Sequence, residues 1–147
     1  MPFSQVKDIL NRATAFHKML VEFYSNIQDI SQKESVKILV DYMSRHEEIL
    51  KKQLNKITDE QQRQITEQFL KYEPEYASCR CFENLNIDKD SSVDDVIDAG
   101  LQLNQCLVNL YNQTEEVSPN QELKDLFSSL KTMEIAEKKK LSRMRGM

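Results

Sequence analysis

The stretch "SRHEEILKKQL", residues 44–54, places the carboxylate of Glu47 on a helix face that otherwise carries hydrocarbon. Val40 and Leu54 lie seven residues before and after Glu47, and side chains spaced by seven share one face of an α-helix. A carboxylate buried on such a face without a partner would cost several kcal/mol. We therefore predict that Glu47 is hydrogen-bonded, paired with a charge, protonated or bound to a cation.

The same pattern occurs twice in the chain. Residues 6–54 align with residues 93–141 at a constant offset of 87 and without a gap. Helical periodicity alone explains the agreement among apolar positions, but each copy also repeats a serine, a tyrosine and the glutamate at 47 and 134. We therefore predict two repeated helical hairpins.

The composition agrees with an all-α protein. The chain has 147 residues, of which 39% are apolar, enough for the core of one domain. Only two glycines and three prolines interrupt long stretches that favour helix. We predict a single domain over residues 1–147, a four-helix up-down bundle with a long crossover between its second and third helices. The predicted helices cover about residues 3–30, 32–57, 92–116 and 119–145, and the connection at 58–91 includes a short helix.

Capping residues predict where these helices begin. A Ser, Thr, Asp or Asn side chain that precedes an apolar period commonly accepts from the first free backbone N–H groups of a helix. The predicted helix starts are Ser31 followed by Glu34, Ser91 or Ser92, and Ser118 followed by Pro119.

A polar layer is predicted near the centre of the bundle. Each helix carries a second apolar stripe spaced by sevens, and its middle member is polar in all four: His17, Glu47, Asn104 and Glu134. Counted from the hairpin turn, His17 and Glu47 differ by about three residues, or roughly 4.5 Å along the helix axis. They are expected to face one another, and the same count applies to Asn104 and Glu134. Glu137, which matches Leu50 in the repeat, is placed to join the layer.

The two helix pairs resemble those of the ferritin-like superfamily, in particular its rubrerythrin-like branch, across essentially the whole chain. The similar segments are "ATAFHKMLVEFY" (13–24) with "SRHEEILKKQL", and "GLQLNQCLVNLY" (100–111) with "KTMEIAEKKKL" (131–141). Members carry a Glu seven residues before the Tyr of the first and third helices and Glu-x-x-His on the second and fourth, and these six side chains hold two irons. The resemblance implies the same fold with a degenerate di-iron site. Glu47 and Glu134 stand at two ligand positions, and the other four hold His17, Leu50, Asn104 and Glu137.

Three interpretations of the polar layer are open. The preferred one is a buried hydrogen-bonded network with no cofactor, in a non-catalytic bundle that acts as a binding or assembly module. The alternative is a metal-binding oxidoreductase of the rubrerythrin-like type. It would hold one divalent ion such as Fe, Mn or Zn through His17, Glu47, Glu134 and Glu137. A true di-iron oxidase or peroxidase is the third. His46 is interpreted as a partly exposed surface group, with metal ligation as its alternative role.

The cysteine content and the net charge limit which cellular environments and which partners are expected. Three cysteines, an odd number, argue against a disulfide framework, so Cys79, Cys81 and Cys106 are interpreted as reduced thiols. A net charge of −4 does not favour nucleic acid. No apolar run has the length of a membrane span, and we expect a cytoplasmic protein. We also expect a homodimer, formed through a bundle face that exposes Val21 and Val108.

Overall fold

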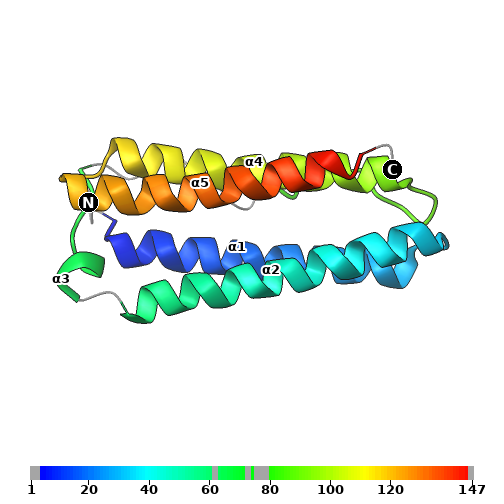
Figure 1. Cartoon of the computed structure of the whole chain (residues 1–147), viewed down its shortest axis with the longest axis horizontal. Coiled ribbons are helices and arrows are strands. Elements are labelled where there is room, and N and C mark those ends of the chain that lie inside the picture. Colours follow the sequence, from blue (N-terminus) through cyan, green and yellow to red (C-terminus); the bar gives the residue numbers. More distant parts are fainter. Residues whose placement is uncertain (1–3, 61–62, 72–73, 75–79, 146–147) are drawn as a thin grey trace.

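The structure is a computed structural model and describes residues 4–60, 63–71, 74 and 80–145. Its long helices are α1 (Val6–Ile30), α2 (Glu34–Glu60), α4 (Val93–Glu116) and α5 (Gln121–Arg143), and the short α3 (Arg63–Thr66) follows α2. α1 packs along α2, and α4 packs along α5, as two hairpins that lie against each other in one bundle (Figure 1). The predicted all-α bundle of two helical hairpins is confirmed.

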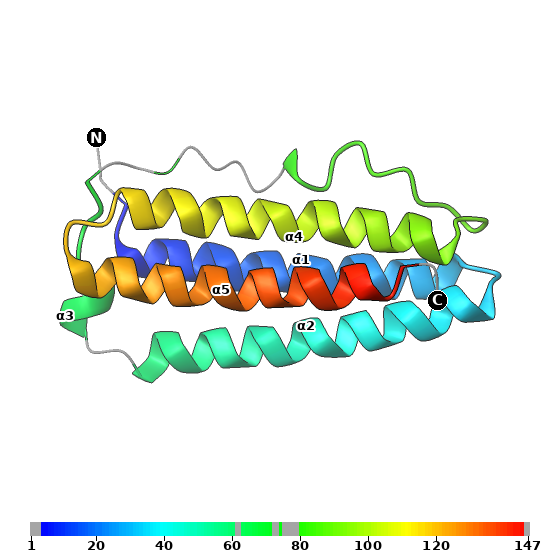
Figure 2. The same cartoon turned by 45° about the horizontal axis from the view of Figure 1, so that its top comes forward.

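The connection between α3 and α4 returns the chain from one end of the bundle to the other, so α2 and α4 run in the same direction (Figure 2). Ring contacts of Phe82 and a disulfide of Cys81 help to attach its second half to the bundle. The ring of Phe82 lies 5.2 Å from that of Phe16 and 6.0 Å from that of Phe23, measured between centroids. Cys81 forms a disulfide with Cys106 of α4, with 6.3 Å between their Cα atoms.

The prediction of reduced thiols was therefore wrong for Cys81 and Cys106. An odd number of cysteines excludes a complete set of bridges but still allows one. The pairing depends on the path by which the connection folds back over α4, and local sequence patterns do not contain that path. Cys79 lies outside the described residues.

The caps of the second hairpin fix where its two helices begin. The Ser92 Oγ accepts from the Asp95 N–H at 3.1 Å, and the Asp95 carboxylate accepts from the Ser92 N–H at 2.8 Å. This reciprocal pair of hydrogen bonds starts α4. Of the two predicted caps, Ser91 and Ser92, the structure uses Ser92. α5 starts later than predicted, because Asn120 is its cap and accepts from the Leu123 N–H at 3.0 Å.

The repeated serine marks the end of a helix and not a start, which corrects the prediction for Ser31 and Ser118. The Ser31 N–H donates to the Ile27 carbonyl at 2.9 Å and closes α1. The Ser118 hydroxyl donates to the Thr114 carbonyl at 2.7 Å, beside the end of α4. The Ser31 backbone N–H and the Ser118 hydroxyl therefore each satisfy a carbonyl near the end of the first helix of their hairpin. The Ser31 Oγ accepts from the Lys33 N–H at 3.1 Å, before the first residue of α2.

Gly100 allows α4 to approach the first hairpin closely. A Cβ atom at this position would lie 2.8 Å from Tyr24 Oη of α1, Met43 Cε of α2 and Leu141 Cδ2 of α5. Three helices therefore converge on the bare backbone of the fourth, and they enclose a continuous apolar core. No described helix has the uninterrupted apolar length that spanning a bilayer requires.

Reduction of the Cys81–Cys106 disulfide is expected to lower the free energy of unfolding by about 2 to 4 kcal/mol, because the bridge links residues 25 apart and restricts the unfolded chain. Chemical denaturation with and without a thiol reductant measures the difference. Cys81→Ser should abolish the effect of the reductant, whereas the control Cys79→Ser should keep it. Equal unfolding free energies of the parent in both conditions would contradict the prediction.

Candidate functional site

The imidazole of His17 lies between two carboxylates that come from different hairpins. Its Nδ1 donates to Glu47 Oε2 of α2 at 2.5 Å. Its Nε2 lies 3.1 Å from Glu134 Oε1 of α5, an ion-pair distance, although these two atoms are not aligned as a hydrogen bond. His17 and Glu134 are fully buried, and the side chain of Glu47 is 13% exposed. Water therefore screens these charges weakly.

Asn104 of α4 completes the layer. Its Nδ2 donates to Glu134 Oε2 at 2.9 Å, so the Glu134 carboxylate faces a donor on each oxygen. The structure thus brings His17, Glu47, Asn104 and Glu134 together, with one side chain from each long helix. Sequence reasoning placed His17 opposite Glu47 and Asn104 opposite Glu134, but did not anticipate the contact of His17 with Glu134. This second contact could have been inferred from the sequence, because a buried imidazole has two ring nitrogens and each needs a partner.

The two carboxylates determine the protonation of His17. Burial by itself lowers the pKa of His17, but the close carboxylate of Glu134 and the hydrogen-bonded carboxylate of Glu47 outweigh burial and raise it to about 10. Burial raises the pKa of Glu47, and the bond with His17 opposes that increase. We therefore expect His17 to be an imidazolium at neutral pH, with an N–H on each nitrogen.

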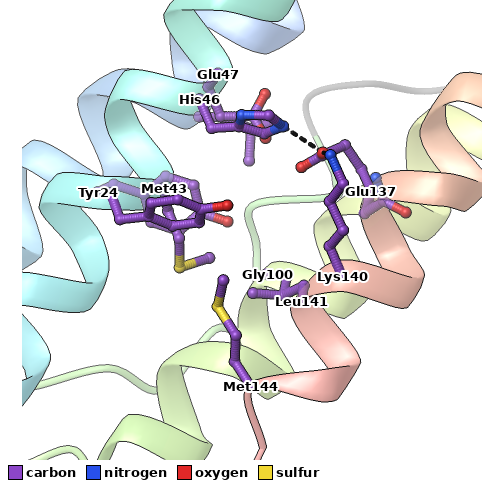
Figure 3. Close-up of a pocket in the computed structure, with 12 residues that line it drawn as sticks. Tyr24, Met43, His46, Glu47, Gly100, Glu137, Lys140, Leu141 and Met144 are labelled. Carbon is purple, nitrogen blue, oxygen red and sulfur yellow. Dashed lines mark hydrogen bonds and ion pairs between the residues drawn. The ribbon is translucent and has the colours of Figure 1, made fainter.

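A second, partly buried pair joins α2 to α5 beside this layer, in a narrow pocket that all four long helices line (Figure 3). His46 Nε2 pairs with the carboxylate of Glu137, which the dashed line in Figure 3 marks. The ring of Tyr42 stacks on the His46 ring with 6.0 Å between centroids, and Lys140 Nζ lies 3.7 Å from Glu137. Glu137 is thus paired with His46 and not with His17.

The pairing of His46 with Glu137 was not predicted from the sequence. The side chain of His46 is 22% exposed, so it is a partly buried group at the edge of the pocket. Its place in the apolar period of α2, three residues after Met43, was the signal that it points inward.

These residues do not fit a pair of irons. Both ring nitrogens of His17 already face carboxylate oxygens, and Leu50 offers no donor atom at all. Asn104 turns its NH₂ group, not its oxygen, toward Glu134. The four side chains considered for a single metal are divided between two separate contacts, His17 with Glu47 and Glu134, and His46 with Glu137.

Comparison with known proteins supports the fold. No protein-family model matches the chain, and no curated protein matches it. A crystal structure of a candidate ferritin-like diiron-carboxylate protein from Thermotoga maritima superposes with a TM-score of 0.67 at 18% sequence identity. The match covers 99% of this chain and 97% of that chain. The protein therefore has the ferritin-like fold.

Replacing His17 is expected to be costly. His17→Leu should lower the free energy of unfolding by about 3 to 5 kcal/mol, because it leaves Glu47 and Glu134 buried without a cation. Adding Glu47→Leu and Glu134→Gln should restore much of the loss, since no stranded charge then remains. Denaturant unfolding measures both effects. The control Glu48→Leu, at a more exposed neighbour, should change stability by less than about 0.5 kcal/mol. No recovery in the triple variant would show that His17 does not act through the carboxylates.

Stability is also expected to fall as the pH rises from about 6.5 to about 10. The unfolded chain releases the His17 proton near pH 6.5, whereas the folded protein holds it until about pH 10. The stabilisation from this proton is therefore fully present below pH 6.5 and is lost toward pH 10. Denaturant unfolding across this range tests the slope, which His17→Gln should remove. Nitrogen NMR of the imidazole at pH 8 should show two N–H groups, and a neutral ring would contradict the assignment.

Proposed function

We propose that this protein is a non-catalytic ferritin-like bundle that serves as a binding or assembly module, and that a protonated histidine carries the positive charge at its centre. The observation that supports this function is the position of His17 between Glu47 and Glu134. In di-iron members of the fold, metal ions neutralise carboxylates contributed by both hairpins. Here an imidazolium supplies positive charge between carboxylates of both hairpins, which gives Glu47 and Glu134 a structural role.

The geometry around the layer also supports a non-catalytic centre. Metal catalysis needs an open coordination position for a substrate or water. Both nitrogens of His17 face carboxylate oxygens, and Glu134 accepts from Asn104 as well. The adjoining pocket is narrow and is lined mainly by packed side chains of the four long helices.

The alternative function is a metal-dependent oxidoreductase with a single ion. The presence of three carboxylates, Glu47, Glu134 and Glu137, within one part of the bundle favours a cation there. Such an ion would have to displace the proton of His17 and break the pair of His46 with Glu137. Metal analysis separates the two functions.

Protein purified without chelators and then incubated anaerobically with ferrous iron is expected to retain far less than one metal ion per chain after desalting. Elemental analysis by mass spectrometry measures the content of iron, manganese and zinc. One tightly bound metal ion per chain would support the single-metal alternative. Two irons per chain would contradict the proposed function.

A variant with restored ligands is the matched control for this experiment. It carries four substitutions: His17→Glu, Leu50→His, Asn104→Glu and Glu137→His. These changes reproduce the six side chains that the resemblance implies, so the variant should bind about two ferrous ions per chain and give an oxo-bridged absorption band in air. A folded variant that binds no iron would show that the alignment of these helices with the di-iron proteins is wrong.

A further inference from the structure

The outer face of α2 exposes three large apolar side chains in a row. Ile38, Tyr42 and Ile49 are 64%, 46% and 50% exposed, and their spacing of four and seven residues places them on one side of the helix. The row is about 16 Å long at 1.5 Å per residue. Val21 and Val108, which the sequence indicated as exposed, are half-buried instead, so the row on α2 exposes more apolar surface than the face predicted from the sequence.

A groove lies beside this apolar row. It runs between α2, the first turn of α4 and the end of α5, and it is mostly apolar. Its lining residues are Ser35, Ile38, Leu39, Tyr42, Val93 and Met144. A row of protruding side chains next to a hollow of the same chemistry is the arrangement that two copies of one surface need in order to interlock.

Charged side chains flank the row with opposite signs at its two ends. Glu34 and Asp41 lie toward the start of α2, and Arg45 and Lys52 lie toward its end. Their spacing of seven, four and seven residues places all four along the same edge of the apolar row. The Arg45 side chain is 78% exposed and pairs with Asp41 within its own helix, which leaves most of its donors open to a neighbour.

We propose that a second copy of this chain docks on this face, with the two α2 helices antiparallel about a two-fold axis near residues 43–44. Glu34 then lies opposite the partner's Lys52, and Asp41 lies opposite the partner's Arg45. Ile38 lies opposite the partner's Ile49, which reaches the apolar groove. A parallel arrangement would instead align like charges, so the charge pattern selects the antiparallel one.

This homodimer makes the proposed assembly role specific and rests on it. The two-fold axis forms every contact twice, so three apolar side chains and two charge pairs per copy contribute double to one interface. Tyr42 lies at its centre, where aromatic side chains contribute most to binding. The bundle interior stays unchanged, because none of these contacts uses the layer around His17.

Sedimentation equilibrium of the full chain at about 1 to 100 μM tests the interface. The expected species is a dimer, with twice the monomer mass of 17.3 kDa. Ile38→Glu combined with Ile49→Glu should weaken association at least about a hundredfold, because it buries charges against each other. The control Ile30→Glu changes an exposed apolar residue outside this face and should stay dimeric. A monomeric parent, or a dimer that the double variant leaves intact, would overturn the proposal.

Charge reversal tests the antiparallel register. Asp41→Arg alone and Arg45→Asp alone each place like charges together at both symmetric contacts, so each variant should dimerise at least about tenfold more weakly. An equimolar mixture of the two should form a heterodimer, detected by native mass spectrometry, because unlike charges then meet at both contacts. Circular dichroism should show both variants folded, since an exposed pair contributes little to the fold. A mixture that forms no heterodimer would overturn the register.

The outcomes for the interface and for the proposed function are distinguishable. A dimer that retains stoichiometric iron would contradict the non-catalytic function and leave the interface standing. A metal-free monomer would overturn the interface and leave the absence of a metal centre standing.

Discussion

The bridge from Glu47 through His17 to Glu134 is the interaction on which the rest of the bundle depends. Each hairpin packs extensively within itself, and the two hairpins meet mainly where α4 lies against α1 and α2. The His17–Glu134 contact adds a charged tie between α1 and α5 at a fully buried level. Sliding or rotating one hairpin against the other would separate these charges, and an unpaired buried charge costs several kcal/mol. The charged layer therefore fixes the register of the two hairpins.

The close approach at Gly100 and the polar layer belong to one arrangement. Gly100 and Asn104 are four residues apart and share a face of α4. Because a Cβ at position 100 would collide with side chains of α1, α2 and α5, the glycine sets how near α4 comes to the first hairpin. One turn later on the same face, Asn104 donates to Glu134 of α5. This face of α4 therefore packs closely against its neighbours at one level and hydrogen-bonds within the polar layer at the next.

Contacts within one hairpin could be predicted from the sequence, whereas contacts between the two hairpins could not. Periodicity and the count from each turn depend on neighbouring residues, and they placed His17 opposite Glu47 across one hairpin. His17 with Glu134 and His46 with Glu137 join different hairpins, so they depend on how the hairpins dock. The Cys81–Cys106 bridge depends on the path of the connection. Periodicity within single helices contains neither kind of information, because helix faces can be matched in several ways.

The charged interior and the proposed outer interface lie on opposite sides of α2. Glu47 points to the layer, whereas Ile49, two residues later, points to solvent. A helix with a buried carboxylate on one side cannot rotate freely about its axis, because rotation would separate that carboxylate from its partner or expose the apolar core. The buried contacts of Glu47 therefore determine the direction in which Ile38, Tyr42 and Ile49 point. Tyr42 also stacks on His46, so the apolar row is connected through one ring to the pair that His46 makes with Glu137. In this way the buried charges of the polar layer hold the outer surface of α2 in the one orientation that the proposed symmetric partner requires.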